Sequence, residues 1–116
     1  MEKNNPIREK SYAFALRIIP FCRELMAKKE YVLSKQLLKS GTSIGANVEE
    51  ALQAQSRKDF ISKLSIALKE SVESKYWLRL LRDSKLTTVE KTASLLADLD
   101  EIIKLLTAII KTTKGS

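Results

Sequence analysis

The sequence contains no histidine, and this absence narrows the chemistry open to the protein. Histidine is the usual general base near neutral pH, the usual partner of a catalytic serine or cysteine, and the commonest metal ligand. The only cysteine, Cys22, excludes an intrachain disulfide and favours a reducing compartment. We therefore expect a cytoplasmic protein that is not an enzyme and that holds no metal or cofactor, with Cys22 as a buried packing thiol.

Glycine and proline are also scarce, with three and two among 116 residues. The apolar residues recur at three- and four-residue spacing rather than alternating, which indicates helices and argues against strands. The N-terminus is polar and no apolar run reaches the roughly 18 residues of a membrane span, so neither a signal peptide nor membrane association is expected. Residues 1–116 are predicted to form one all-α domain.

Four long helices are predicted from this spacing and from residues typical of helix starts. Asn5 before Pro6 resembles an N-cap, Ser56 is suited to cap the third helix, and Thr87 with Glu90 fits a capping box for the fourth. The predicted ranges are Pro6–Lys28, 31–55, Arg57–Asp83 and Thr88–Lys111, followed by a frayed tail at 112–116. Because the connections are short, we predict an antiparallel up-down-up-down four-helix bundle.

The stretch 36–54 places two glycines and several small polar residues within one predicted helix. Gly41 and Gly45 each cost about 1 kcal/mol of helix propensity relative to alanine, so we expect another chain segment to pack closely there. The serines and the asparagine have no general base or metal to work with, which favours hydrogen bonding between packed helices over catalysis. The predicted helix-packing residues are Gln36, Ser40, Gly41, Ser43, Gly45 and Asn47.

The third predicted helix carries more apolar surface than the core of a four-helix bundle requires. A wide core face would account for the excess, but an oligomer interface is favoured because exposed apolar patches on monomers are usually small. Glu70 and Glu73 lie amid this surface, where salt bridges to a neighbouring helix or subunit are favoured over acid–base chemistry. The predicted interface residues are Glu70, Glu73, Tyr76, Trp77 and Leu80.

The net charge of +7 favours an anionic partner such as RNA or DNA, although a charge of this size also serves solubility. Residues 1–30 and 57–83 each carry +3, so the excess lies on the first and third helices. The candidate nucleic-acid contacts are Arg17, Lys39, Lys69, Arg79 and Arg82. A protein-interaction scaffold that binds no nucleic acid is the alternative function.

Two segments carry a specific resemblance to a known family. They are QLLKSGTSIGANVEEA and S-x-x-DFI-x-KL-x-IALKES-x-E-x-x-YWLRLL, and residues 11–15 and 109–110 also fit. The chain resembles the bacterial four helix bundle proteins, also called 23S rRNA intervening-sequence proteins. One departure is Lys39, which stands where the family commonly has an arginine, and a lysine would not reproduce a bidentate phosphate contact.

The resemblance implies a left-handed four-helix bundle that forms a homopentamer. The family includes accessory proteins of diversity-generating retroelements, which are basic pentamers that associate with a reverse transcriptase and with nucleic acid. A reverse transcriptase or another protein is therefore an expected partner. The family supplies no catalytic residues to carry over.

Overall fold

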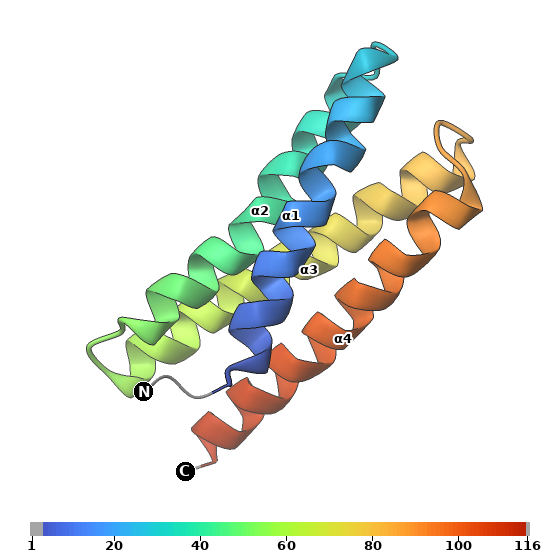
Figure 1. Ribbon diagram of the computed structural model, residues 1–116. Coiled ribbons are helices and arrows are strands. Elements are labelled where there is room, and N and C mark those ends of the chain that lie inside the picture. Colours follow the sequence, from blue (N-terminus) through green and yellow to red (C-terminus); the bar gives the residue numbers. More distant parts are fainter. Residues whose placement is uncertain (1–3, 116) are drawn as a thin grey trace.

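Four antiparallel helices make up the computed structural model, which describes residues 4–115 (Figure 1). They are α1 Pro6–Ala27, α2 Val32–Leu52, α3 Arg57–Asp83 and α4 Val89–Lys114. Each helix packs against the next in the chain, and α1 also packs against α4, which closes the bundle. The predicted all-α, up-down four-helix bundle is therefore confirmed, and the bundle measures 46 × 23 × 23 Å.

Side-chain caps mark the starts of α1, α3 and α4. The capping oxygens belong to Asn5, Ser56 and Thr88, which accept hydrogen bonds from the backbone N–H groups of Arg8, Asp59 and Lys91 at 3.2, 3.0 and 3.1 Å. Each such cap contributes about 1 kcal/mol. The cap of α4 is Thr88 and not Thr87 as predicted, because the Thr87 N–H donates to the Leu81 carbonyl and keeps Thr87 in the connection.

Two helix ends differ from the predicted ones. Helix α2 ends at Leu52 rather than near Gln55, because the N–H groups of Gln53 and Ala54 bond to carbonyls three residues back and tighten the last turn. Helix α4 continues three residues beyond Lys111, so the predicted fraying of 112–116 is wrong up to Lys114. Its last turn is held by Thr113, whose hydroxyl donates to the Ile109 carbonyl at 2.7 Å. Residue 116 lies outside the described residues.

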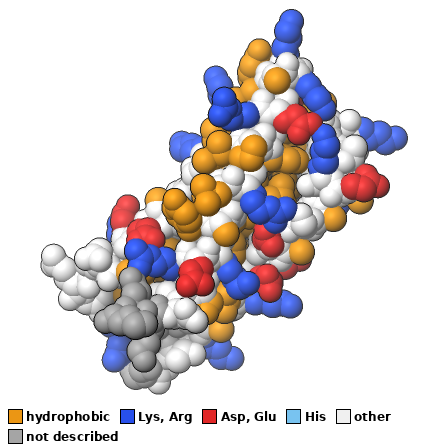
Figure 2. All heavy atoms as spheres, in the orientation of Figure 1, with side chains coloured by type: hydrophobic (Ala, Val, Ile, Leu, Met, Phe, Trp, Pro, Cys, Tyr) orange, Lys and Arg blue, Asp and Glu red, His pale blue; other side chains and the backbone are white. Residues whose placement is uncertain are grey.

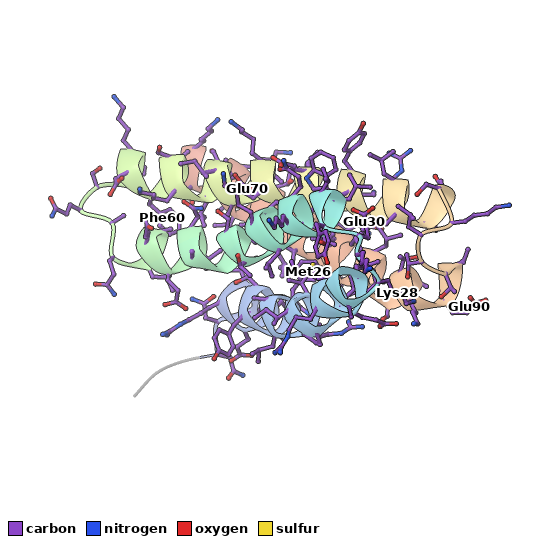
Figure 3. All side chains as sticks on the ribbon, turned by 90° about the horizontal axis from the view of Figure 1, so that it is seen from above. Met26, Lys28, Glu30, Phe60, Glu70 and Glu90 are labelled. Carbon is purple, nitrogen blue, oxygen red and sulfur yellow. The ribbon has the colours of Figure 1, made fainter. Side chains whose placement is uncertain are left out.

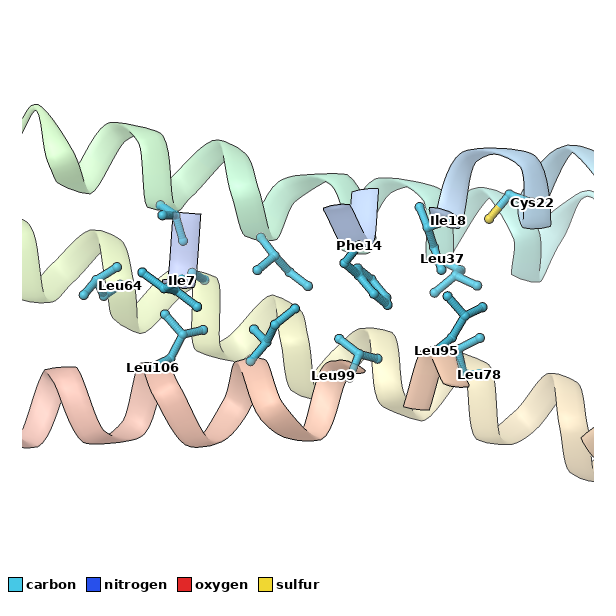
Figure 4. Packing of buried hydrophobic residues seen from close by; sticks show 14 of the residues in the cluster. Ile7, Phe14, Ile18, Cys22, Leu37, Leu64, Leu78, Leu95, Leu99 and Leu106 are labelled. Atoms are coloured by element: carbon cyan, nitrogen blue, oxygen red, sulfur yellow. The ribbon is translucent and has the colours of Figure 1, made fainter. Parts of the chain in front are cut away.

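The core runs along the axis of the bundle and takes apolar side chains from all four helices (Figure 4). The largest fully buried side chains include Phe14 and Ile18 of α1, Leu37 and Ile44 of α2, Leu78 of α3 and Leu99 of α4. Burial of each such side chain contributes about 1.5–3 kcal/mol. Cys22 is also fully buried, and burial raises the pKa of its thiol to about 12, which confirms that it packs in the core as a neutral thiol. Among the described helices, none has the length and apolarity that a bilayer span demands.

Candidate nucleic-acid interface

The two glycines of α2 lie where α1 comes closest. A Cβ atom on Gly41 would stand 3.2 Å from Cγ1 of Ile18, and one on Gly45 would stand 3.4 Å from the backbone oxygen of Ser11. Both neighbours belong to α1, so the absence of side chains on α2 lets these two helices pack closely. The glycines therefore stand at the predicted kind of position, a close approach between helices.

The small polar residues of α2 form bonds of two kinds. Ser40 is buried, and its hydroxyl lies 2.8 Å from the hydroxyl of Ser74, which joins α2 to α3 across the core. Asn47 instead donates to the carbonyl and the hydroxyl of Ser43 at 2.9 and 3.2 Å. The predicted bond between helices is thus present for Ser40, whereas the bonds of Asn47 and Ser43 stay within one turn of α2.

Gln36 differs from the prediction, because it is exposed at the edge of this face. The residues of α2 that are buried are Ser34, Leu37, Ser40, Gly41, Ile44, Val48 and Ala51. This stripe is rotated away from Gln36 and is centred on the large apolar side chains Leu37, Ile44 and Val48. These three residues recur at seven- and four-residue spacing, a pattern in the sequence that indicates the buried face of α2.

The predicted interface residues of α3 divide between the core and the surface. The Trp77 ring is half-buried against the core, and its indole N–H donates to the Glu73 carboxylate at 3.1 Å. Tyr76 is 52% exposed and meets the Trp77 ring edge to face, with centroids 5.2 Å apart. Leu80 is exposed one turn beyond Tyr76, and Val72 is exposed one turn before it. Val72, Tyr76 and Leu80, at four-residue spacing, form an uncovered apolar stripe, here called the α3 stripe.

Glu70 and Glu73 do not form the predicted salt bridges within the described residues. Partial burial raises the pKa of Glu70 most, and the neighbouring Glu73 raises it further. Lys69 and Lys39 lower the pKa of Glu70, but neither closes an ion pair with it. Glu70 lies on α3 along the side that faces α2, as Figure 3 shows. Across residues 4–115, no three or more acidic or thiol side chains converge as a metal site would require.

Two of the five nucleic-acid candidates form ion pairs with carboxylates of the same chain at the surface of the bundle. Arg17 binds Asp98 and Ser94 of α4, and Arg82 binds its neighbour Asp83 at 2.7 Å. These two guanidinium groups are therefore engaged with carboxylates of their own chain, and their role as nucleic-acid contacts stays a prediction. The other three candidates, Lys39, Lys69 and Arg79, are exposed and make no ion pair within the described residues.

The seam between α1 and α4 is built from charged side chains. Lys10 pairs with Glu101 at 3.4 Å, Arg17 with Asp98, and Glu24 with Lys91. The α1 members are seven residues apart, so they return to the same face of the helix on every second turn. Elsewhere Arg8, Lys63 and Lys75 pair with Glu49, Glu50 and Asp100. Pairs within the bundle thus occupy seven carboxylates, including Asp83.

The cations that take part in no ion pair carry the surplus charge of the surface. Within residues 4–115 they are Arg23, Lys29, Lys35, Lys39, Lys58, Lys69, Arg79, Lys85, Lys104, Lys111 and Lys114. On the face shown in Figure 2, Lys and Arg side chains are densest toward the end at which α1 passes into α2. The sequence could not separate free from paired cations, because the pairing depends on which residues of two helices face each other.

Comparison with known proteins gives a family and a fold. The family described as 23S rRNA-intervening sequence protein matches residues 3–108. A crystal structure of a protein of unknown function from the S23 ribosomal protein family of Bacteroides thetaiotaomicron is 54% identical, with a TM-score of 0.89. The match covers 90% of this chain and 98% of that one. No curated protein matches the chain.

Proposed function

The chain belongs to the 23S rRNA-intervening sequence protein family, and from this premise we propose that it is a non-enzymatic homo-oligomer that binds RNA or DNA electrostatically. Its surface, rather than a pocket, carries this function. The proposal places the protein in the cytoplasm, where both nucleic acids are available in a bacterium.

The observation that carries the proposal is that more cationic side chains than carboxylates lie outside the ion pairs. Eleven Lys and Arg side chains of residues 4–115 stand outside the ion pairs, whereas only six carboxylates of the same residues do, namely Glu9, Glu30, Asp59, Glu70, Glu73 and Glu90. Cations that are not neutralised by their own chain can each replace a counterion on a phosphate backbone. An oligomer multiplies these contacts, because each subunit presents the same set.

The α3 stripe supports self-association. Val72 and Tyr76 are 54% and 52% exposed, and Leu80 continues the stripe one turn further. Aromatic side chains flanked by apolar ones are enriched in the cores of protein interfaces. The pentameric state is the one that the family resemblance implies, and native mass spectrometry measures it.

The experiment is a titration of labelled single-stranded RNA, double-stranded RNA and single-stranded DNA, followed by fluorescence anisotropy. The logarithm of the association constant should fall linearly with the logarithm of salt between about 50 and 200 mM, with a slope set by the number of phosphates neutralised. Absence of binding to all three nucleic acids at the lowest salt would refute the proposal.

A second stripe favours the alternative function, a scaffold for a protein partner such as a reverse transcriptase. Tyr12 and Leu16 on the outer face of α1 are 63% and 55% exposed, and Ile19 extends the stripe at the spacing of a helical face. Affinity purification with and without nuclease separates the two functions. A protein partner bound to this stripe should be retained after nuclease treatment, and it should be lost on Leu16→Lys substitution.

A further inference from the structure

We infer that nucleic-acid phosphates dock on one end of the bundle, the end at which both the 28–31 and the 84–88 connections lie (Figure 1). This surface, here called the connection end, presents Arg23, Lys29, Lys35, Arg79 and Lys85. Figure 3 shows Lys28 and Glu30, from the first connection, and Glu90, from the start of α4, at this same end of the bundle. The inference rests on the proposed function and assigns it a location.

The first observation is a pair of matched lysines in a backbone conformation that favours glycine. Lys29 and Lys85 have φ angles of 68° and 65°, and they are the only residues with positive φ in the described chain. Each follows a helix end and closes the same motif. The N–H groups of Lys29 and Glu30 donate to Met26 and Leu25 at 2.9 Å, and those of Lys85 and Leu86 donate to Arg82 and Leu81 at 3.0 Å.

Both motifs are Schellman C-caps, in which the left-handed residue is usually glycine because a Cβ atom is strained there. A lysine in this position gains a favourable interaction with the helix C-terminus, but a glycine would avoid the strain. Because lysine is strained at both of these equivalent positions, its presence there is better explained by a function of the lysine side chain than by a gain in folding stability. Here the side chain supplies an ammonium group at the tip of each connection.

The second observation is that the carboxylates of this end are largely occupied. Lys28 and Lys91 bind Glu24, and Arg82 binds Asp83. The Glu30 carboxylate accepts the Leu33 N–H at 2.9 Å and so caps α2.

Two carboxylates at this end, those of Glu30 and Glu90, form no ion pair in the described chain, and the bond from the Leu33 N–H leaves Glu30 charged. Against these two carboxylates stand the five free cations of the connection end. At the opposite end the free cations are Lys58, Lys111 and Lys114, and in the middle they are Lys39, Lys69 and Lys104. The connection end is therefore the richest part of the bundle in unneutralised positive charge.

The third observation concerns the apolar residues beside these cations. Tyr31 is 49% exposed directly after the first connection, and an exposed aromatic ring next to lysines is typical of surfaces on which single-stranded bases stack. Val32 and Val89 are also exposed, so an anionic membrane is the competing partner. We favour nucleic acid because the lysines occupy the tips of the connections, whereas the valines begin the helices that follow.

The test is the double variant Lys29→Gly and Lys85→Gly, compared with Lys58→Gln and Lys111→Gln at the opposite end. Both variants remove two positive charges, and all four lysines are exposed and outside the ion pairs. The glycine variant should melt a few degrees higher than wild type because backbone strain is relieved. Its affinity for single-stranded RNA should nevertheless fall, and its salt slope should decrease by about 1.4, two phosphate contacts at about 0.7 each. The glutamine variant should keep the wild-type slope.

Each result has a defined meaning. Equal losses in the two variants, or a larger loss in the glutamine variant, would overturn the connection end while leaving electrostatic binding in place. No binding by the wild type would remove the proposed function itself. Wild-type binding to phosphatidylserine vesicles but not to RNA would overturn the inference in favour of a membrane partner. If the glycine variant melts lower than wild type, Lys29→Asn with Lys85→Asn repeats the test, because asparagine also tolerates the left-handed conformation.

Discussion

At the scale of single residues, Gly41 and Gly45 differ in the room that α1 leaves them. A Cβ atom on Gly41 would lie 3.2 and 3.3 Å from two carbons of Ile18, and 3.4 Å from the Phe14 ring. A Cβ atom on Gly45 would meet its nearest neighbour, the Ser11 backbone, at an ordinary contact distance of 3.4 Å. The sequence could show that both positions resist helix formation, but it could not show which of the two is tighter.

We expect Gly41→Leu to destabilise the fold by about 1–3 kcal/mol or more, because extra carbon atoms must enter a filled core. Gly45→Ala should be neutral or stabilising by up to about 1 kcal/mol, since alanine is the better helix former and its methyl group fits. Urea unfolding followed by circular dichroism measures both changes. A Gly41→Leu protein as stable as the wild type would contradict the packing described for α1 and α2.

Glu70 provides a prediction of pH dependence. Burial and Glu73 raise the pKa of this carboxyl in the folded chain, so the folded protein binds the proton more tightly than the unfolded chain does. Stability should therefore fall as pH rises from below the unfolded pKa of about 4.3 through the folded pKa. Glu70→Gln should stabilise slightly at pH 7, by about 0.5 kcal/mol, and this gain should vanish in acid. Thermal melts at a series of pH values test this pH dependence, and Glu9→Gln, at an exposed position of α1, is the control.

At the scale of elements, the helix starts were more predictable than the helix faces. The capping roles of Asn5 and Ser56 followed from local sequence, because a cap bonds to a backbone N–H only three residues away. The exposed position of Gln36 and the internal bond between Asn47 and Ser43 did not follow, because they depend on how far α2 is rotated against two neighbours. Such a rotation is set by the packing of large side chains, which no local pattern specifies.

The seam between α1 and α4 should respond to salt. The Arg17–Asp98 pair is partly exposed, with 44% and 36% of the two side chains accessible, so its coupling energy should be about 0.2–1 kcal/mol. A double-mutant cycle with Arg17→Gln and Asp98→Asn measures this energy by urea unfolding. The coupling should shrink at high salt because partly exposed charges are screened. A coupling of zero at low salt would show that the seam depends on its apolar contacts alone.

At the scale of the whole molecule, the fold could be predicted and the pairing of the surface charges only in part. Four helices with short connections leave one simple arrangement, and the bundle followed from it. The charged surface is different, because Arg17 and Lys39 each follow a leucine within a predicted helix but only Arg17 meets a carboxylate on another helix. Lys29 and Lys85 were not among the predicted contacts, since their left-handed backbone is a property of the folded connections. A lysine directly after a helix end and before a short connection was the signal that could have indicated them.

Two exposed tyrosines on different helices provide a matched comparison that tests which surface forms the subunit interface. Tyr76 on the α3 stripe is 52% exposed and Tyr12 on α1 is 63% exposed, so lysine is accommodated at either position without entering the core. If the α3 stripe forms the subunit interface, Tyr76→Lys should place an unpaired charge in a desolvated contact and lower the mass of the assembly. Tyr12→Lys should leave that mass unchanged.

Native mass spectrometry gives the subunit count, and circular dichroism verifies that each variant remains helical. Loss of the edge-to-face contact with Trp77 should by itself cost Tyr76→Lys about 0.5–1.5 kcal/mol, which reduces stability without altering the subunit count. A helical Tyr76→Lys protein of unchanged mass would therefore exclude the α3 stripe as the interface. Dissociation by Tyr12→Lys instead would assign the subunit contact to α1, and it would leave the α3 stripe as the surface available to a different protein.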